Sequence, residues 1–175
     1  MRYGRARLLA IAIAALGLAT VQATGSRAAP DRGALVCTWG GTPDAPTGVI
    51  TFSPGITDFP STGPIEFTAT GALGGGEGCT GRLTFRGVVD PGTSCQVGMP
   101  FHATATGFPP IKYVESNLGA VGTNPVILYD DEWNVVGSEQ AQFLTDVLDD
   151  SDCNTPEGLT SANWSDTLEL FTDQP

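Results

Sequence analysis

The sequence predicts an all-β fold, an antiparallel β-sandwich or a small β-barrel, stapled by two disulfides. Apolar and polar residues alternate with a period of two in several short runs, which is typical of strands with one dry and one wet face. The 23 glycines and 13 prolines separate these runs with turns. The chain also holds 4 cysteines, an even number that suits a disulfide framework.

The clearest strands are predicted over residues 65–70, 82–86 and 99–106. In the first of them Ile65 begins a set of apolar residues on one face, and glutamate and threonine occupy the other. The stretch 149–163 contains no predicted element. Weaker alternation or β-rich composition predicts further strands at 35–40, 47–52, 111–115, 125–130, 134–138, 140–148 and 166–172.

Residues 1–29 are predicted to be a cleavable secretion signal, and residues 30–175 a single β-rich domain. Three arginines precede an apolar run from Leu8 to Val21, and this run is shorter than the roughly 18 residues that a membrane span needs. We therefore expect a protein that is secreted or associated with the cell wall and has no membrane span in its mature form. Cleavage is expected after Ala23 or after Ala28 or Ala29.

The charge is strongly negative. The whole chain has a formal net charge of −11, and four of its 8 basic residues lie in the predicted signal. The remaining four oppose 19 acidic residues, which gives −15 for residues 30–175. Such a charge repels phosphate backbones, so we expect no nucleic-acid partner.

All four cysteines, Cys37, Cys79, Cys95 and Cys153, follow the predicted signal. Export favours two disulfides over reactive thiols, and the absence of a Cys-x-x-Cys pair argues against a metal site. Three pairings are possible. Loop length favours Cys79–Cys95 with Cys37–Cys153, because the shorter loop is easier to close.

Four segments carry a resemblance to small secreted actinobacterial proteins. They are residues 37–41 (Cys-Thr-Trp-Gly-Gly), 78–81 (Gly-Cys-Thr-Gly), 128–137 (around Leu-Tyr-Asp) and 153–158 (Cys-Asn-Thr-Pro-Glu-Gly). The resemblance covers most of the chain after the signal and implies secretion, disulfides and β structure, but no activity. Where those proteins have an Asn-Gly-type turn, this chain has residues 131–133, Asp-Glu-Trp.

The sequence predicts no enzymatic activity and no cofactor. It contains neither a Gly-x-Ser-x-Gly nor a Ser-x-x-Lys motif. Its 19 acidic residues leave a carboxylate-based, glycosidase-like hydrolase as the alternative, although no pair of them stands out. The run Asp150-x-Asp152-x-Asn154 opens like a calcium loop but lacks the glycine and glutamate that follow in an EF-hand, so we expect a solvated loop.

Two sets of residues are candidate binding sites. Arg82, Arg86 and His102 fall on the wet faces of two consecutive strands, where they form a cationic surface for an acidic group or pair with acids such as Glu66. Trp133 is predicted in a turn beside Asp130 and other acids, an arrangement that suits stacking on a sugar ring. Trp39, in contrast, is predicted to pack in the core.

These observations together favour a non-enzymatic extracellular binding or surface-interaction module. Its partner would be an extracellular glycan or a surface protein, held by loops on a rigid sheet scaffold. A purely structural envelope protein without a ligand is a further alternative.

Overall fold

The computed structural model describes residues 33–96, 100–116, 124–141 and 152–171. All of these residues belong to one compact unit, Arg32–Pro175. The predicted signal, residues 1–29, lies outside the described residues.

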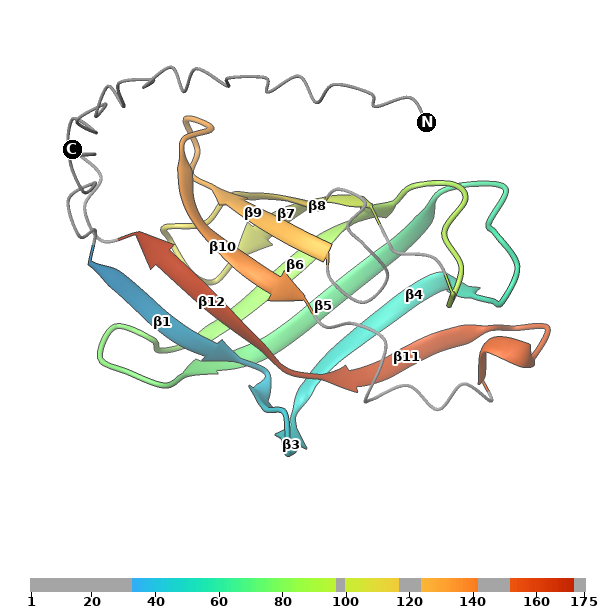
Figure 1. The fold of residues 1–175 in the computed structure, drawn as a ribbon, viewed down its shortest axis with the longest axis horizontal. Coiled ribbons are helices and arrows are strands. Elements are labelled where there is room, and N and C mark those ends of the chain that lie inside the picture. Colours follow the sequence, from blue (N-terminus) through green and yellow to red (C-terminus); the bar gives the residue numbers. More distant parts are fainter. Residues whose placement is uncertain (1–32, 97–99, 117–123, 142–151, 172–175) are drawn as a thin grey trace, which may run out of the picture. The chain divides into compact units, whose positions relative to one another are not determined.

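The described residues form a closed antiparallel β-barrel of eight strands (Figure 1). The barrel therefore replaces the sandwich as the architecture, within the predicted all-β class. The strands of the main sheet are β1 (Ala34–Trp39), β4 (Gly48–Ile56), β5 (Ile65–Gly74), β6 (Arg82–Val89), β7 (Phe101–Thr106), β8 (Tyr113–Ser116), β9 (Asn124–Tyr129), β10 (Val135–Ala141), β11 (Leu159–Trp164) and β12 (Asp166–Phe171).

The barrel closes where the first strand meets β5. The ring runs β1-β12-β10-β9-β8-β7-β6-β5, and pairing of Trp39 with Leu73 joins β5 back to β1. Beyond this point β4 continues along β5, and β11 pairs with β4. A small hairpin, β2 (Gly41–Thr42) with β3 (Ala45–Pro46), separates β1 from β4. Closure gives each strand of the ring a partner on both sides, and β11 stands at the end of the sheet order.

Two glycines allow this close approach. Gly71 of β5 lies against Gly40, and a Cβ on Gly71 would come within 2.7 Å of the Gly40 Cα. Gly40 itself has a φ of +77°, which favours glycine. Larger residues here would push β5 away from the segment that follows β1.

The alternation predicted from the sequence separates the interior from the outer face. Phe67 of β5, Leu83 and Phe85 of β6, and Phe101 of β7 are all buried, as predicted. Their neighbours in sequence on β6 and β7, including Arg86 and the other outward residues, are exposed or partly exposed. A single hydrophobic core therefore fills the barrel.

One part of the strand prediction differs from the structure, and another is only partly described by it. β11 occupies part of the stretch 149–163, where no element was predicted. A register shift between Leu159 and Ser161 interrupts its alternation, which explains why the sequence pattern missed it. Of the strand predicted at 140–148, residues 140 and 141 belong to β10, and the remaining residues lie outside the described ones.

The disulfides are Cys37–Cys79 and Cys95–Cys153, so the pairing favoured from loop length is wrong. Loop length weighs only the entropy of the unfolded chain. In the barrel β1 lies beside β5, and this neighbourhood places Cys37 next to the β5–β6 loop that carries Cys79.

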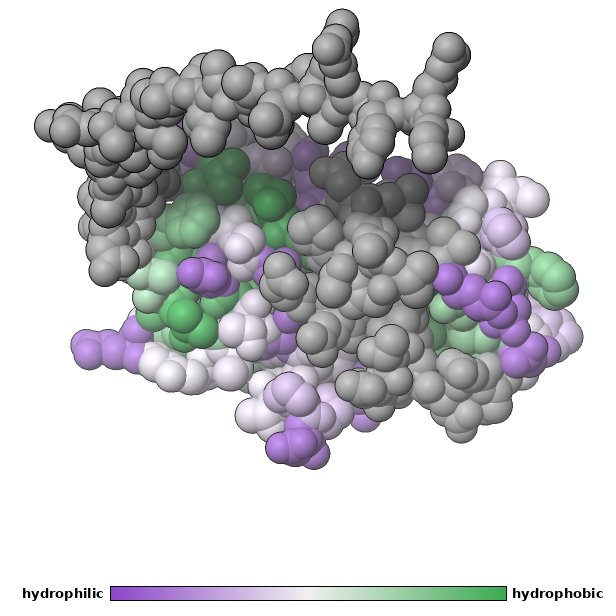
Figure 2. All heavy atoms as spheres, in the orientation of Figure 1, coloured by the Kyte–Doolittle hydropathy of each residue, from purple (hydrophilic) through white to green (hydrophobic). Residues whose placement is uncertain are grey.

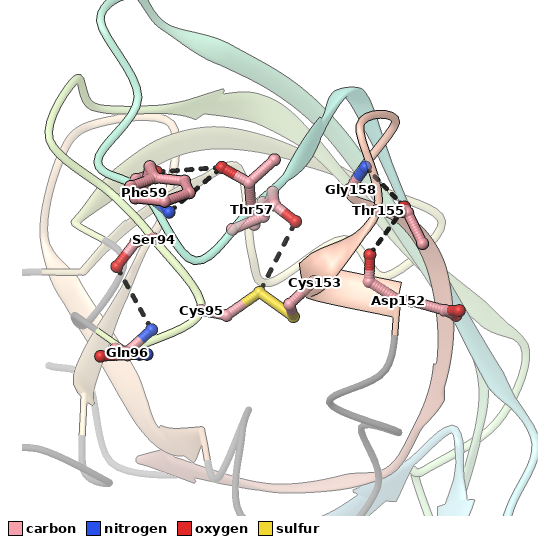
Figure 3. Close-up of a disulfide and its surroundings, with 10 residues drawn as sticks. Thr57, Phe59, Ser94, Cys95, Gln96, Asp152, Cys153, Thr155 and Gly158 are labelled. Atoms are coloured by element: carbon pink, nitrogen blue, oxygen red, sulfur yellow. Dashed lines mark hydrogen bonds between the residues drawn. A yellow bond between two sulfur atoms is a disulfide. The ribbon is translucent and has the colours of Figure 1, made fainter.

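The second disulfide joins two loops at one end of the barrel (Figure 3). Cys95 follows β6, and Cys153 lies in a short 3-10 helix, Asp152–Asn154, that precedes β11. The segment after β4 also meets them here, since the Cys95 N–H donates to the Thr57 carbonyl at 2.9 Å and the Asp58 N–H to the Cys153 carbonyl at 3.2 Å. Three connections are thereby tied together.

Removing either disulfide is expected to lower the free energy of unfolding by about 2–5 kcal/mol. The sequence separations are 42 and 58 residues, and loop entropy grows so slowly with length that the two losses should be similar. The test is urea unfolding of the double variants Cys37→Ser/Cys79→Ser and Cys95→Ser/Cys153→Ser, followed by tryptophan fluorescence. A loss below about 1 kcal/mol in both would contradict the stapling role.

Within the described residues, no helix has the length and apolar character that crossing a membrane requires.

Candidate functional site

Trp133 is displayed by a tight turn between β9 and β10. The Asp130 carboxylate builds this turn, because its Oδ1 accepts the backbone N–H groups of Glu132 at 2.9 Å and Asn134 at 2.8 Å, and its Oδ2 accepts the Asn134 side-chain amide at 3.0 Å. The amide and backbone hydrogen bonds from Asn134, with a further one from Glu132, hold the pKa of Asp130 below its ordinary value. Asp130 thus acts as a turn former.

The turn forms without an Asn-Gly pair because Trp133 adopts the left-handed conformation itself. Its φ is +64°, and in the part of the chain that the structure describes it is the one residue other than glycine with a positive φ. A bulky residue in this region is strained, and strain of this kind gathers at functional sites. The conformation places the indole on the outer face of the barrel.

The indole lies flat on a tyrosine of the neighbouring strand. The rings of Trp133 and Tyr113 are 4.3 Å apart and inclined by only 4°, and Tyr129 packs beside them at 5.5 Å. Trp133 nevertheless remains 54% exposed. The result is an aromatic shelf, Trp133 on Tyr113, with an indole open to solvent.

The aromatic shelf borders a hollow of about 420 Å³ on the outer face of β6, β7 and β8, called here the shelf hollow. Its volume falls within the range of small-molecule sites, roughly 300–1,000 Å³. Its lining combines the shelf with charged, hydroxyl and small groups, namely Arg86, Gly87, His102, Ala103, Thr104, Tyr113, Val114, Glu115 and Trp133.

Of the ionisable residues that line the shelf hollow, His102 and Glu115 contact each other, whereas Arg86 has no acidic partner among the described residues. His102 Nδ1 lies 3.5 Å from Glu115 Oε1, directly across the β7–β8 ladder. The Tyr129 hydroxyl donates to Glu115 Oε2 at 3.4 Å, and burial, with the charge and hydrogen bond of Glu115, raises the pKa of Tyr129. Arg86 forms no ion pair with any described residue. Its guanidinium therefore keeps its donors available for a ligand.

The structure brings together residues that the sequence assigned to two separate candidate sites. Trp133, Arg86 and His102 all line the shelf hollow. Arg82 does not join them, because it stands at the start of β6 and its Nη1 lies 3.5 Å from Thr70 Oγ1. The alternative pairing of the arginines with Glu66 does not occur, since neither arginine lies within ion-pair distance of a described carboxylate.

Sequence reasoning missed a pair of carboxyl groups inside the barrel, Glu139 on β10 and Asp166 on β12. Glu139 is 2% exposed, and its neighbours across the two ladders, Val126 and Leu168, are fully buried. Burial, the charge of Asp166 and their mutual hydrogen bond raise the pKa of Glu139 well above its ordinary value. Burial raises the pKa of Asp166 to about 6, against the opposing hydrogen bonds from Glu139 and Thr167.

Both carboxyl groups therefore keep their protons to a higher pH than exposed carboxyl groups do. Neither residue lines the shelf hollow or the other two hollows described below.

A further hollow of about 400 Å³ lies at the end of the barrel where β1 begins and β12 ends. Figure 2 shows apolar residues gathered over this part of the molecule. The lining of this hollow is mainly apolar, and Asp130 is the one charged residue in it. The residues are Leu35, Phe108, Pro109, Pro110, Asp130, Val136, Leu170 and Phe171.

Among the described residues, one group has ligand atoms close enough together to hold a metal ion: Asp58, Cys95 and Cys153. Both cysteines are bonded to each other, so neither offers the thiolate that a metal requires. In the predicted acidic loop, Asp152 and Asn154 are exposed, while Asp150 lies outside the described residues. Calcium binding there stays without structural support.

Comparison of the chain with protein-family models, curated proteins and solved structures finds no match. The resemblance to small secreted actinobacterial proteins stays a prediction.

Proposed function

We propose that the protein is a non-enzymatic extracellular binding module that holds a glycan in the shelf hollow. The single observation that carries this proposal is the aromatic shelf, where a strained turn displays Trp133 at 54% exposure on top of Tyr113. Large aromatic rings are normally placed where they bury apolar surface. An exposed indole fixed in one orientation offers that surface to a ligand instead.

A sugar ring fits the chemistry around the shelf. One face of a pyranose carries C–H groups that pack on an indole, and its edge carries hydroxyls that need hydrogen-bond partners. Arg86 supplies donors, Glu115 supplies acceptors, and His102 supplies a group of either kind. All three lie beside Trp133 in the same hollow.

The extracellular location rests on the disulfides and on the predicted signal. Both cysteine pairs are oxidised in the folded chain. Structural disulfides of this kind persist in secreted proteins and are rare in the cytosol. A module that meets glycans outside the cell is consistent with this chemistry.

Alanine at position 133 is expected to weaken glycan binding about tenfold or more, because aromatic residues at the centre of a site carry a large share of the binding energy. The measurement is calorimetric titration of residues 30–175 with tetragalacturonate and cellotetraose. Phe59→Ala is the matched control, since Phe59 is 80% exposed and lies outside the shelf hollow. Equal affinities of Trp133→Ala and the unchanged protein would contradict the proposal, as would binding of neither sugar.

A further inference from the structure

We propose that the glycan site extends across Arg86 into a second hollow, so that the ligand is an acidic oligosaccharide with a carboxylate on Arg86 and sugar rings on both sides. This inference rests on the proposed function. The proposed function says where the ligand binds, and this inference says how long the ligand is and what charge it carries.

The second hollow, called here the hydroxyl hollow, lies on the outer face over β4, β5 and β6. Its volume is about 490 Å³, close to that of the shelf hollow. Arg86 and Gly87 line both hollows, which therefore meet at β6. The lining residues of the hydroxyl hollow are Thr51, Phe52, Ser53, Glu66, Phe67, Thr68, Arg86, Gly87 and Val88.

The strand register places Arg86 at the centre of this surface. On one side it pairs with Thr68 of β5, and on the other with Thr104 of β7. The two threonines line different hollows, and Arg86 stands between them. A ligand that crosses from one hollow to the other must pass over its guanidinium.

The guanidinium is suited to a carboxylate. Arginine presents its N–H donors in a planar fork that matches the two oxygens of a carboxylate. The carboxylates nearest in the ladders are engaged or distant: Glu115 contacts His102 and Tyr129, and Glu66 makes no ion pair with Arg86. The positive charge of Arg86 is therefore left for an acidic group of the ligand.

The two hollows offer complementary chemistry to successive rings. The shelf hollow has the indole of Trp133, on which a ring face can stack. In the hydroxyl hollow Phe52 and Phe67 point into the core, so the side chains available to a ligand, apart from Arg86, are three hydroxyls, the Glu66 carboxylate and the exposed Val88. Thr51, Thr68 and Glu66 there can exchange hydrogen bonds with sugar hydroxyls. One ring stacks, and the next is held by hydrogen bonds.

The test compares galacturonate monomer, dimer and tetramer with cellotetraose, each titrated into residues 30–175. We expect the tetramer to bind at least about tenfold more tightly than the monomer, because the second hollow adds contacts within one ligand. The double variant Thr51→Val/Thr68→Val should lose this gain while binding the monomer as before. Retention of the gain in that variant would overturn the role of the hydroxyl hollow.

Arg86→Gln should remove the preference for tetragalacturonate over cellotetraose, with Arg82→Gln as the matched control. Arg82 lies on the same face of the same strand but lines neither hollow. Equal binding of monomer and tetramer overturns the extension and leaves the proposed function standing. Equal binding of the acidic and neutral tetramers overturns the contact between Arg86 and a carboxylate of the ligand. Binding of neither overturns both the inference and the proposed function.

Discussion

Replacing Trp39 with alanine is expected to lower the free energy of unfolding by about 3–5 kcal/mol, the range for a large aromatic residue removed from a core. Trp39 is fully buried, lies 4.3 Å from the ring of Phe85 and meets Trp164 edge-on at 4.1 Å. Its indole N–H also donates to the Leu83 carbonyl at 3.1 Å. Removing it leaves a cavity and a buried carbonyl without this donor.

The measurement is urea unfolding of Trp39→Ala beside Trp133→Ala, followed by far-ultraviolet circular dichroism so that no signal depends on the residue removed. The same substitution at the exposed Trp133 should change the free energy of unfolding by about 1 kcal/mol or less. Similar losses in both variants would show that the barrel core is not built around Trp39.

The carboxyl pair in the barrel should make the protein less stable as the pH rises, the reverse of ordinary acid denaturation. The folded-state pKa of Asp166 is about 6, above the unfolded value near 3.8, so between these values the folded state binds the extra proton. The stabilisation is complete below the unfolded pKa and is lost as the pH rises through the folded one. The free energy of unfolding should therefore fall measurably across this window.

The test is the free energy of unfolding in urea from pH 4 to pH 8 for the unchanged protein and for Asp166→Asn. As the pH rises, the unchanged protein should lose free energy of unfolding relative to Asp166→Asn, because the asparagine cannot ionise. Glu139 should add to this slope in the same direction, since its pKa is also raised well above its ordinary value. Glu139→Gln should likewise gain stability relative to the unchanged protein towards pH 8. Parallel curves for all three would contradict the account of this pair.

The sequence predicted the all-β class because alternation is a local pattern. It did not distinguish a sandwich from a barrel, because closure of a barrel is not visible in any local pattern. Both architectures alternate dry and wet residues, whereas the pairing of Trp39 with Leu73 joins strands far apart in the chain. The same pairing determines the disulfides, so their arrangement could not follow from loop lengths. Position in the ladder, rather than separation in sequence, selects the partner of Cys37.

The two members of the carboxyl pair differ in how far the sequence could reveal them. Asp166 shares its parity with Leu168 and Leu170 in a strand that was predicted, so its inward position was available from the pattern. Glu139 was hidden, because a register shift between Val135 and Gly137 changes which residues of β10 point inward. A bulge of this kind leaves no clear mark on a period-two pattern.

The candidate site was predictable in its parts but not in its assembly. Turn chemistry placed Trp133 on the surface, and alternation placed Arg86 and His102 on wet faces. That they line one hollow depends on the packing of Trp133 on Tyr113, a residue 20 positions earlier on another strand. Such a contact arises from the pairing of β8 with β9 and the direction of the turn that follows.

The most direct test of the glycan site follows the indole N–H signals of Trp39, Trp133 and Trp164 by ¹H–¹⁵N nuclear magnetic resonance during titration with tetragalacturonate. Trp39 and Trp164 are buried, and Trp133 is exposed at the shelf hollow. We expect the Trp133 signal to shift in a saturable manner while the signals of Trp39 and Trp164 stay in place. A saturable shift confined to Trp39 or Trp164, or no shift of Trp133 at millimolar sugar, would contradict the proposed glycan site.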